Sequence, residues 1–424
     1  MTTVAPVYAR REIATDAVAA ARAHAFAVGR VLEREHFALL SWGAAARLEL
    51  EGGLEDGPSV ASAVAGLRAI APYDRESTAD PGGPLALGAL AFDRAGWSEL
   101  IVPALTVIAT PGRAVAIAVG PPDEVATALA AWPFAAGEAP VPPAPTRAPD
   151  AFTLASVRPH EDFEQQVGLA VEAIRAGEID KVVLVREVEI TANRPLRQHH
   201  LLERLRALHP SCCTFAIDGF VGASPELLVR RRGGVIDAQP LAGTVARSGD
   251  PEEDRRLAEQ LLASAKDRAE HRFVVDAILT ALAPYCRDLD APAVPHLLEL
   301  RNVAHLATHI TGELADEGED RPDVLTLVAE VHPTPAVGGS PRAAALEYLA
   351  KFEPVERGRF AGPVGYLAAD GDGEWWIGIR AALLEGERTR LLAGVGIVAG
   401  SEPTAELAET QLKLQALLAA AVRP

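Results

Sequence analysis

The chain has 424 residues, of which 49% are hydrophobic, 23% are charged and 5% are aromatic, and its formal net charge at pH 7 is −18. This is the composition of a globular protein, with enough length for one large domain or two ordinary ones. The acidic balance, without a concentrated basic patch, excludes nucleic acid as an expected partner. An anionic small molecule can still bind, provided that local cations or a metal ion offset the charge.

The cysteines and the N-terminus indicate in which cellular compartment the protein is expected. Cys212, Cys213 and Cys286 are odd in number and two of them are adjacent, so they predict neither a disulfide framework nor a zinc site. The N-terminus lacks the apolar core of a signal peptide, and the chain has no uncharged apolar run of about 18 residues. We therefore expect a cytoplasmic protein without a membrane span.

The chain divides into three parts. Residues 1–132 mix short apolar strands with helical stretches and are predicted to form an α+β segment. Residues 133–152 are rich in proline and alanine and have no hydrophobic period, which indicates an extended linker. Residues 153–424 contain the patterns that point to chemistry, so this part is predicted to be the catalytic domain.

Two candidate acid–base residues follow the linker. A helix is predicted over residues 160–177, and Lys181 stands at the entry to the strongly apolar strand that comes next. A lysine there can guard a sheet edge, but if it is buried, desolvation favours the neutral amine that a general base needs. Glu226 follows a turn proline among successive antiparallel strands, where a solvated glutamate is the ordinary alternative. The later turn with Gly243 and Thr244 offers N–H groups and a hydroxyl to an anion.

A second set of polar residues follows. One long helix is predicted over residues 251–282, and on it Asp267, Glu270 and His271 share a face. An acidic pair beside a histidine is an unusual choice for a purely structural helix. His305 lies in an apolar strand, where a hydrogen-bonded core histidine is the usual interpretation.

The C-terminal stretch, residues 391–418, has the pattern of a strand, a glycine-rich turn and a helix. Glu406, Glu409 and Lys413 fall at i, i+3 and i+7, so they share one helix face. Two carboxylates near a helix start suit a hard cation such as Mg²⁺, although a solvated face is the common alternative. Arg380, in an apolar strand just before, is expected to have an anionic partner.

These residues lie in motifs that occur in a known order. The motifs span about residues 155–420 and are DKVVLVRE, GASPELL, PLAGT, AKDRAEH, AHLAT, HPTPAVGGSP, RGRFAGPVGY, GEWWIGIR and AGVGIV, followed by SEP, ELAET and KL. In them the chain resembles the chorismate-utilising enzymes, which comprise isochorismate synthases, salicylate synthases and the synthase subunits for anthranilate and aminodeoxychorismate. The resemblance implies an α+β fold with two large, mostly antiparallel β-sheets packed face to face and helices outside. It also implies that the N-terminal part belongs to the same body.

The resemblance further implies a role for each candidate residue. Lys181 matches the general base that activates water, and Glu226 matches the general acid that protonates the departing C4 hydroxyl. Glu270 and Glu409 match ligands of Mg²⁺. The other matching positions are Asp267 and Glu406 around the metal, and Gly243, Thr244, His305, Phe360, Arg380, Gly394 and Lys413 around the substrate.

Three positions discriminate within the family. The amine-transferring synthases carry glutamine where Lys181 stands, and aminodeoxychorismate synthases carry a nucleophilic lysine where this chain has Ala242. Both positions therefore favour water as the nucleophile. Salicylate synthases often have tyrosine in place of Phe360. We predict an isomerase similar to isochorismate synthases, which adds a hydroxyl at C2 of chorismate and removes the one at C4.

The alternatives differ in product or in class. A salicylate synthase, which goes on to eliminate pyruvate, is the runner-up, followed by a component of anthranilate or aminodeoxychorismate synthase and by an inactive chorismate-binding protein. The resemblance implies a role in menaquinone or siderophore biosynthesis. We expect a monomer that binds chorismate and Mg²⁺ and has no obligatory glutaminase subunit.

Overall fold

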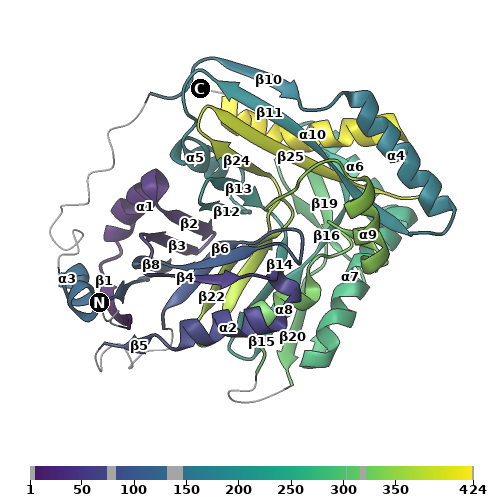
Figure 1. The fold of residues 1–424 in the computed structure, drawn as a ribbon. Helices are drawn as coiled ribbons and strands as arrows, with labels where there is room; N and C mark the ends of the chain where they lie inside the picture. Colours follow the sequence, from purple (N-terminus) through teal and green to yellow (C-terminus); the bar gives the residue numbers. More distant parts are fainter. Residues whose placement is uncertain (1–4, 74–82, 131–146, 302, 316–320, 423–424) are drawn as a thin grey trace.

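The structure is a computed structural model (Figure 1), and the residues that it describes are 5–73, 83–130, 147–301, 303–315 and 321–422. The predicted linker over residues 133–152 lies outside the described residues as far as residue 146. The described chain confirms the predicted α+β class, with two large sheets facing each other and helices outside them.

The larger sheet has 13 strands and is antiparallel except where β1 pairs with β5. Its strands in spatial order are β10 (Phe152–Ser156), β11 (Lys181–Ala192), β25 (Arg388–Ile397), β24 (Ala381–Glu385), β13 (Phe220–Ser224), β12 (Cys213–Ile217), β2 (Arg30–Arg34), β3 (Phe37–Trp42), β8 (Leu105–Thr110), β9 (Arg113–Gly120), β1 (Val7–Ile13) and β5 (Ala71–Pro72), with β21 (Gly339–Ser340) paired to β11. Because β12 pairs with β2, strands from the two ends of the chain form one continuous sheet.

The second of the two large sheets has nine strands. They are, in spatial order, β17 (Cys286–Asp290), β20 (Ile310–Leu314), β15 (Val235–Gln239), β14 (Leu227–Arg232), β23 (Gly373–Ile377), β22 (Pro363–Ala368), β6 (Leu85–Ala89), β7 (Ser98–Val102) and β4 (Ala46–Leu50). A separate three-stranded sheet contains β16 (Leu241–Ala246), β19 (Val303–Ala307) and β18 (His296–Glu299). The pairing of β22 with β6 again joins the two parts of the chain.

The helices cover the outer faces of the sheets (Figure 1). They are α1 (Ala17–Val28), α2 (Gly57–Arg68), α3 (Pro122–Ala130), α4 (His160–Arg175), α5 (Gln198–Leu208), α6 (Pro251–Ala263), α7 (Ala265–Leu282), α8 (Val324–Val331), α9 (Arg342–Phe352) and α10 (Pro403–Val422). Helices α1, α4, α5 and α10 contact the larger sheet, and α2 and α8 contact the nine-stranded sheet. Among the described helices, none is long and apolar enough to cross a membrane.

Large apolar side chains fill the space between the two sheets. Leu32 and Phe215 from the larger sheet pack in one cluster with Leu87 and Trp376 from the nine-stranded sheet. Burying a side chain of this size contributes about 1.5–3 kcal/mol. This contact between the two inner faces keeps the strands that carry the candidate site residues in a fixed relation.

The single long helix predicted over residues 251–282 is wrong in one respect, because the structure has two helices there. Helix α6 ends at Ala263, and Ser264 leaves the helical conformation with φ −63° and ψ 112°. Its side chain accepts a hydrogen bond from the Asp267 N–H and so caps α7. Serine competes well for such a cap, and the break sets the direction of the helix that carries Asp267 and Glu270.

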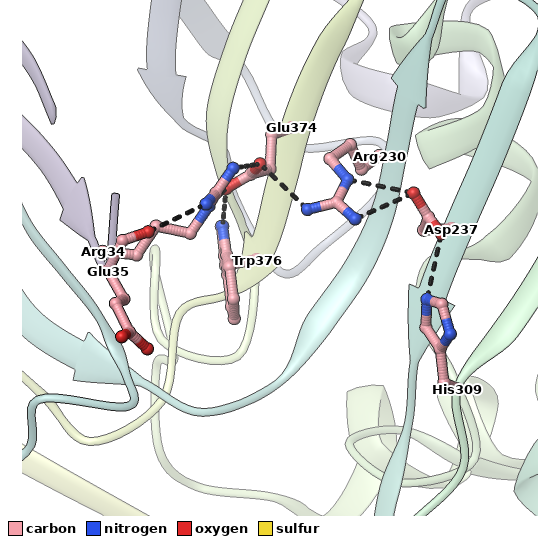
Figure 2. Close-up of polar contacts among 7 residues, drawn as sticks. All are labelled: Arg34, Glu35, Arg230, Asp237, His309, Glu374 and Trp376. Carbon is pink, nitrogen blue, oxygen red and sulfur yellow. Dashed lines mark hydrogen bonds and ion pairs between the residues drawn. The ribbon is translucent and has the colours of Figure 1, made fainter. Parts of the chain in front are cut away.

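A buried ionic network ties the two large sheets together (Figure 2). Glu374 on β23 is fully buried and accepts two hydrogen bonds of 2.8 Å from Arg34 on β2, which belongs to the other sheet. The Trp376 indole N–H donates to the same carboxylate over 2.8 Å. On the other side, Arg230 lies 3.7 Å from Glu374 and donates to Asp237, which His309 contacts in turn.

This network predicts a large effect of removing the cation that donates to Glu374. Arg34→Met leaves the buried Glu374 carboxylate without its main partner, and breaking a buried pair on one side costs about 3–5 kcal/mol. We expect this loss in urea unfolding followed by fluorescence. Arg272→Met, which breaks the half-exposed Arg272–Asp276 pair on α7, is the control and should cost less than about 1 kcal/mol. Equal losses in the two variants would contradict the role given to Glu374.

Candidate active site

The structure places every predicted site residue in the wall of one cavity of about 180 Å³. These residues are Lys181, Glu226, Gly243, Thr244, Asp267, Glu270, His305, Phe360, Arg380, Gly394, Glu406, Glu409 and Lys413. They come from β11, β16, β19 and β25, from α7 and α10, and from the connections after β13, α9 and β23. Residues more than 230 positions apart in the chain, such as Lys181 and Lys413, therefore meet at one site.

The pairing of β11 with β25 forms one wall of the cavity. Val183 stands opposite Gly396, and Val185 stands opposite Gly394. A Cβ on Gly396 would lie 2.9 Å from Cε of Lys181, which is closer than such atoms approach. The glycine therefore makes room for the lysine side chain.

Lys181 is buried and does not guard an exposed sheet edge. Only 5% of its surface is exposed, and its Nζ donates to Glu270 Oε1 over 2.7 Å. Its strand is covered on that edge by β21, where Ser340 stands opposite Lys181. Lys181 is therefore a buried residue of the cavity wall, and Glu270 is the carboxylate that it contacts.

Lys413 forms the second lysine–glutamate contact. Its Nζ lies 2.7 Å from Glu409 Oε1 on the same helix and donates to the Gly394 carbonyl over 2.9 Å. Helix α10 is thereby attached to β25 at the cavity. The predicted face of Glu406, Glu409 and Lys413 points into the cavity, and the solvated-face alternative does not hold.

Glu226 is also buried, with 4% of its surface exposed, and is not the solvated turn residue of the ordinary alternative. Its backbone N–H donates to Ser224 Oγ, whose hydroxyl donates to the Ile377 carbonyl over 2.6 Å. Its Oε1 atom has no hydrogen-bond partner among the described residues. Burial raises the pKa of Glu226 to about 7, against the opposing effect of the Leu241 N–H.

Arg380, His305 and Thr244 form a third group. Arg380 has a left-handed backbone with φ +51°, and its Nη2 donates to His305 Nε2 over 3.4 Å. The other ring nitrogen, Nδ1, contacts the Gly243 carbonyl and Thr244 Oγ1. Burial, aided by Arg380, lowers the pKa of His305 to about 3. The imidazole is therefore neutral, with its proton on Nδ1, and leaves the Arg380 charge available for an anion.

Four carboxylates line the cavity from two helices, Asp267 and Glu270 on α7 and Glu406 and Glu409 on α10. Burial raises the pKa of Glu406, and the neighbouring Glu409 charge adds to the shift. In the described part of the chain, no three acidic, histidine or cysteine side chains stand close enough together to hold a metal ion as they are. Glu270 and Glu409 are instead turned toward lysines. The donor set itself, hard oxygens with excess negative charge, fits a divalent cation.

The structure differs from the sequence interpretation at two residues, Arg357 and His271. Arg357 lines the cavity, pairs with Glu353 over 2.6 Å and donates to the Val183 and Val337 carbonyls. Its i, i+4 spacing from Glu353 was the available signal. His271, by contrast, does not line the cavity, since it is buried against Thr308 over 2.7 Å.

The cavity gathers buried acidic and basic side chains from several strands and helices of the fold into the wall of one site, which is the arrangement of an enzyme active site. A profile of the family described as chorismate binding enzyme matches residues 24–422. The chain therefore belongs to the chorismate binding enzyme family. This match includes most of the N-terminal part as well as residues 153–424.

Named relatives point in the same direction. The chain is 45% identical over 270 residues to the salicylate biosynthesis isochorismate synthase of Pseudomonas aeruginosa, covering 62% of this chain and 55% of the relative. It is 42% identical over 271 residues to isochorismate synthase DhbC of Bacillus subtilis, covering 61% of this chain and 67% of the relative. The aligned region thus spans about half to two thirds of these curated relatives.

Solved structures are similar over nearly the whole chain. The menaquinone-specific isochorismate synthase MenF of Escherichia coli has a TM-score of 0.81 at 27% identity, covering 99% of this chain and 95% of that one. Anthranilate synthase component I of Streptococcus pneumoniae has a TM-score of 0.73 at 23% identity, which shows a shared fold.

The burial of Glu226 predicts a pH effect on stability. A carboxyl whose pKa is raised on folding, here from 4.5 to about 7, stabilises the fold fully below pH 4.5, and this contribution is lost as the pH rises through about 7. Melting temperatures of wild type and Glu226→Gln, measured from pH 4 to 8, should therefore diverge, with wild type losing stability relative to the variant. Glu259→Gln, at an exposed position, controls for the loss of one carboxylate. A constant difference across this range would contradict the assignment.

Proposed function

We propose that the protein is an isochorismate synthase, an isomerase that converts chorismate reversibly to isochorismate and depends on Mg²⁺. The observation that carries the proposal is the presence of buried Lys181 and buried, protonatable Glu226 in the wall of the same cavity. Names of the similar proteins support it, since both curated relatives described above are isochorismate synthases.

The substrate is a dianion, and the cavity offers two cations for it. Arg380 provides a guanidinium whose histidine neighbour is neutral, and guanidinium groups bind carboxylates in a fixed geometry. Lys413 lies at the glycine-lined wall beside Gly394. Thr244 and the left-handed Gly243 line the same cavity and complete the proposed substrate contacts.

The acid role falls to Glu226. With a pKa of about 7 it keeps its proton through much of the neutral range, so it can protonate the C4 hydroxyl as that group leaves. Water attacks C2 and forms the new C–O bond, both double bonds of the ring shift by one position, and the C4–O bond breaks. One water enters and one leaves, so substrate and product have the same composition.

The base role falls to Lys181, which takes the proton of the attacking water. In the structure the Nζ of Lys181 donates to Glu270, whereas a base must present its lone pair to the attacking water. The base role therefore requires Glu270 to turn away from the lysine, as it would do as a ligand of a cation. Within the family, the lysine at this position also argues against amine transfer, so we propose that no glutaminase subunit is needed.

Glu270 and Glu409 would hold the magnesium ion, with Asp267 and Glu406 close to it in the cavity wall. When bound, the ion supplies the positive charge that lets a carboxylate of the substrate lie beside these acidic side chains. Residues 153–424 contain all of these groups, and we propose that they form the chorismate-binding catalytic part. The N-terminal strands complete its two large sheets. We further propose that the protein acts as a monomer.

Salicylate formation is the second candidate, because one relative is named for salicylate biosynthesis. That name still describes an isochorismate synthase, and Phe360 stands where salicylate synthases often have tyrosine. Names specific to menaquinone and to a siderophore, vibriobactin, both occur among the similar proteins. We therefore propose the reaction only. Either menaquinone or siderophore biosynthesis could use its product.

The products of the purified protein test this proposal. With chorismate and Mg²⁺ at neutral pH, chromatography should show a mixture of chorismate and isochorismate, with little salicylate or pyruvate. EDTA should abolish turnover and added Mg²⁺ should restore it. Lys181→Ala should lower kcat by about 10²–10⁴-fold, the usual contribution of a general base. Pyruvate released in proportion to turnover would indicate the salicylate synthase, and full activity without metal would overturn the metal assignment.

A further inference from the structure

A second cationic site lies outside the cavity described above, at Arg186 on β11. Only 6% of Arg186 is exposed. Among the described residues, no carboxylate lies within ion-pair distance of it, and burial alone lowers its pKa. An isolated buried charge costs several kcal/mol, so an arginine in this setting calls for an anionic partner.

Arg186 contacts two hydroxyl groups and one imidazole ring, and no carboxylate among the described residues. Its Nε donates to Thr410 Oγ1 over 3.1 Å, and its Nη1 donates to Ser156 Oγ over 3.3 Å and to His160 Nε2 over 3.1 Å. Because an arginine can only donate, His160 Nε2 is the acceptor in this contact. The remaining nitrogen, Nη2, has no acceptor in the part of the chain that the structure describes.

Arg186 lines a cavity of about 140 Å³ between β11, the segment that follows β10, and α4. These elements lie together with α10 at the upper edge of the molecule in Figure 1. A second arginine, Arg158, lines the cavity and is exposed, and the Gln166 amide lines it from α4. Glu187 also lines it, but its carboxylate is paired with Arg390. The cavity therefore has two positive charges that no carboxylate in its wall offsets.

The cavity also lies at the start of α4. This helix of 16 residues begins at His160 after Pro159, and no side chain caps its first turn. The free N–H groups of a helix N-terminus favour negative charge, and the two carboxylates of the first turn, Glu161 and Asp162, do not line the cavity. Pro159 and Phe163, from this first turn, line the same cavity. A helix N-terminus and a buried arginine with a free donor thus meet at one place.

We propose that this cavity, lined by Arg158, Arg186 and the first turn of α4, binds a compact oxyanion, such as a phosphate group or a small carboxylate. The anion would accept hydrogen bonds from Nη2 of Arg186 and from the N–H groups of α4, and Arg158 would close the site from the solvent side. Thr410, which holds Arg186, is the residue after Glu409 on α10. The site is thus next to the main cavity, with Val185 in the wall of both, but Arg380 and Lys413 do not line it.

Binding of inorganic phosphate tests this site, and the measurement needs no turnover, so its outcome is independent of the proposed function. Equilibrium dialysis at constant ionic strength should show one saturable site in the wild-type protein that survives Arg380→Gln. Loss of one charged hydrogen bond weakens binding by about tenfold or more. We expect such a loss in Arg158→Gln and complete loss in Arg186→Gln. Competition by sulfate or by acetate tells whether a tetrahedral anion or a carboxylate fits better.

Arg255→Gln is the matched control, because Arg255 is exposed on α6 and does not line this cavity. It should bind phosphate as the wild type does. If Arg186→Gln fails to fold, the exposed Arg158→Gln decides the question. The proposal is overturned if wild type shows no saturable binding, if Arg158→Gln binds unchanged, or if binding disappears in Arg380→Gln, which would place the phosphate in the main cavity.

Discussion

The antiparallel pairing of β11 with β25 is the constraint on which the site depends. Ten residue pairs run from Val182 opposite Ile397 to Thr191 opposite Arg388. The register puts Gly396 beside Lys181, and the chain leaves β25 directly into α10, whose Lys413 returns to the Gly394 carbonyl. A slip by one residue would turn every side chain of one strand to the opposite face, so the register and the site are specified together.

The electrostatics of the cavity follow from the same arrangement. A chain with a net charge of −18 repels a dianion at long range, so binding requires cations concentrated at one point. Two lysines are each held by one glutamate, while Arg380 faces a neutral histidine. Burial at the same place keeps Glu226 protonated near neutrality. One cavity thus brings together the proposed anion site at Arg380, the proposed proton donor Glu226 and the carboxylates proposed to hold a cation.

The motifs in the sequence were sufficient to predict the two-sheet fold and to identify residues that meet in one cavity. Their spacing carried no information about burial, so Glu226 could equally have been a solvated turn residue. The break at Ser264 was missed because helix periodicity continues across it, and the cap that causes it is a local competition. The contact between Arg34 and Glu374 could not be predicted from the sequence, because it depends on how the two sheets face each other.

In the proposed reaction, water attacks C2 while the C4 hydroxyl leaves. The most direct measurement is a short incubation of the protein with chorismate and Mg²⁺ in water enriched in ¹⁸O, with mass spectrometry of the isochorismate formed. We expect one ¹⁸O atom in each product molecule, located in the C2 hydroxyl. Isochorismate that retains only the oxygen of chorismate would show that the hydroxyl moves within the substrate, and would contradict the roles given to Lys181 and Glu226.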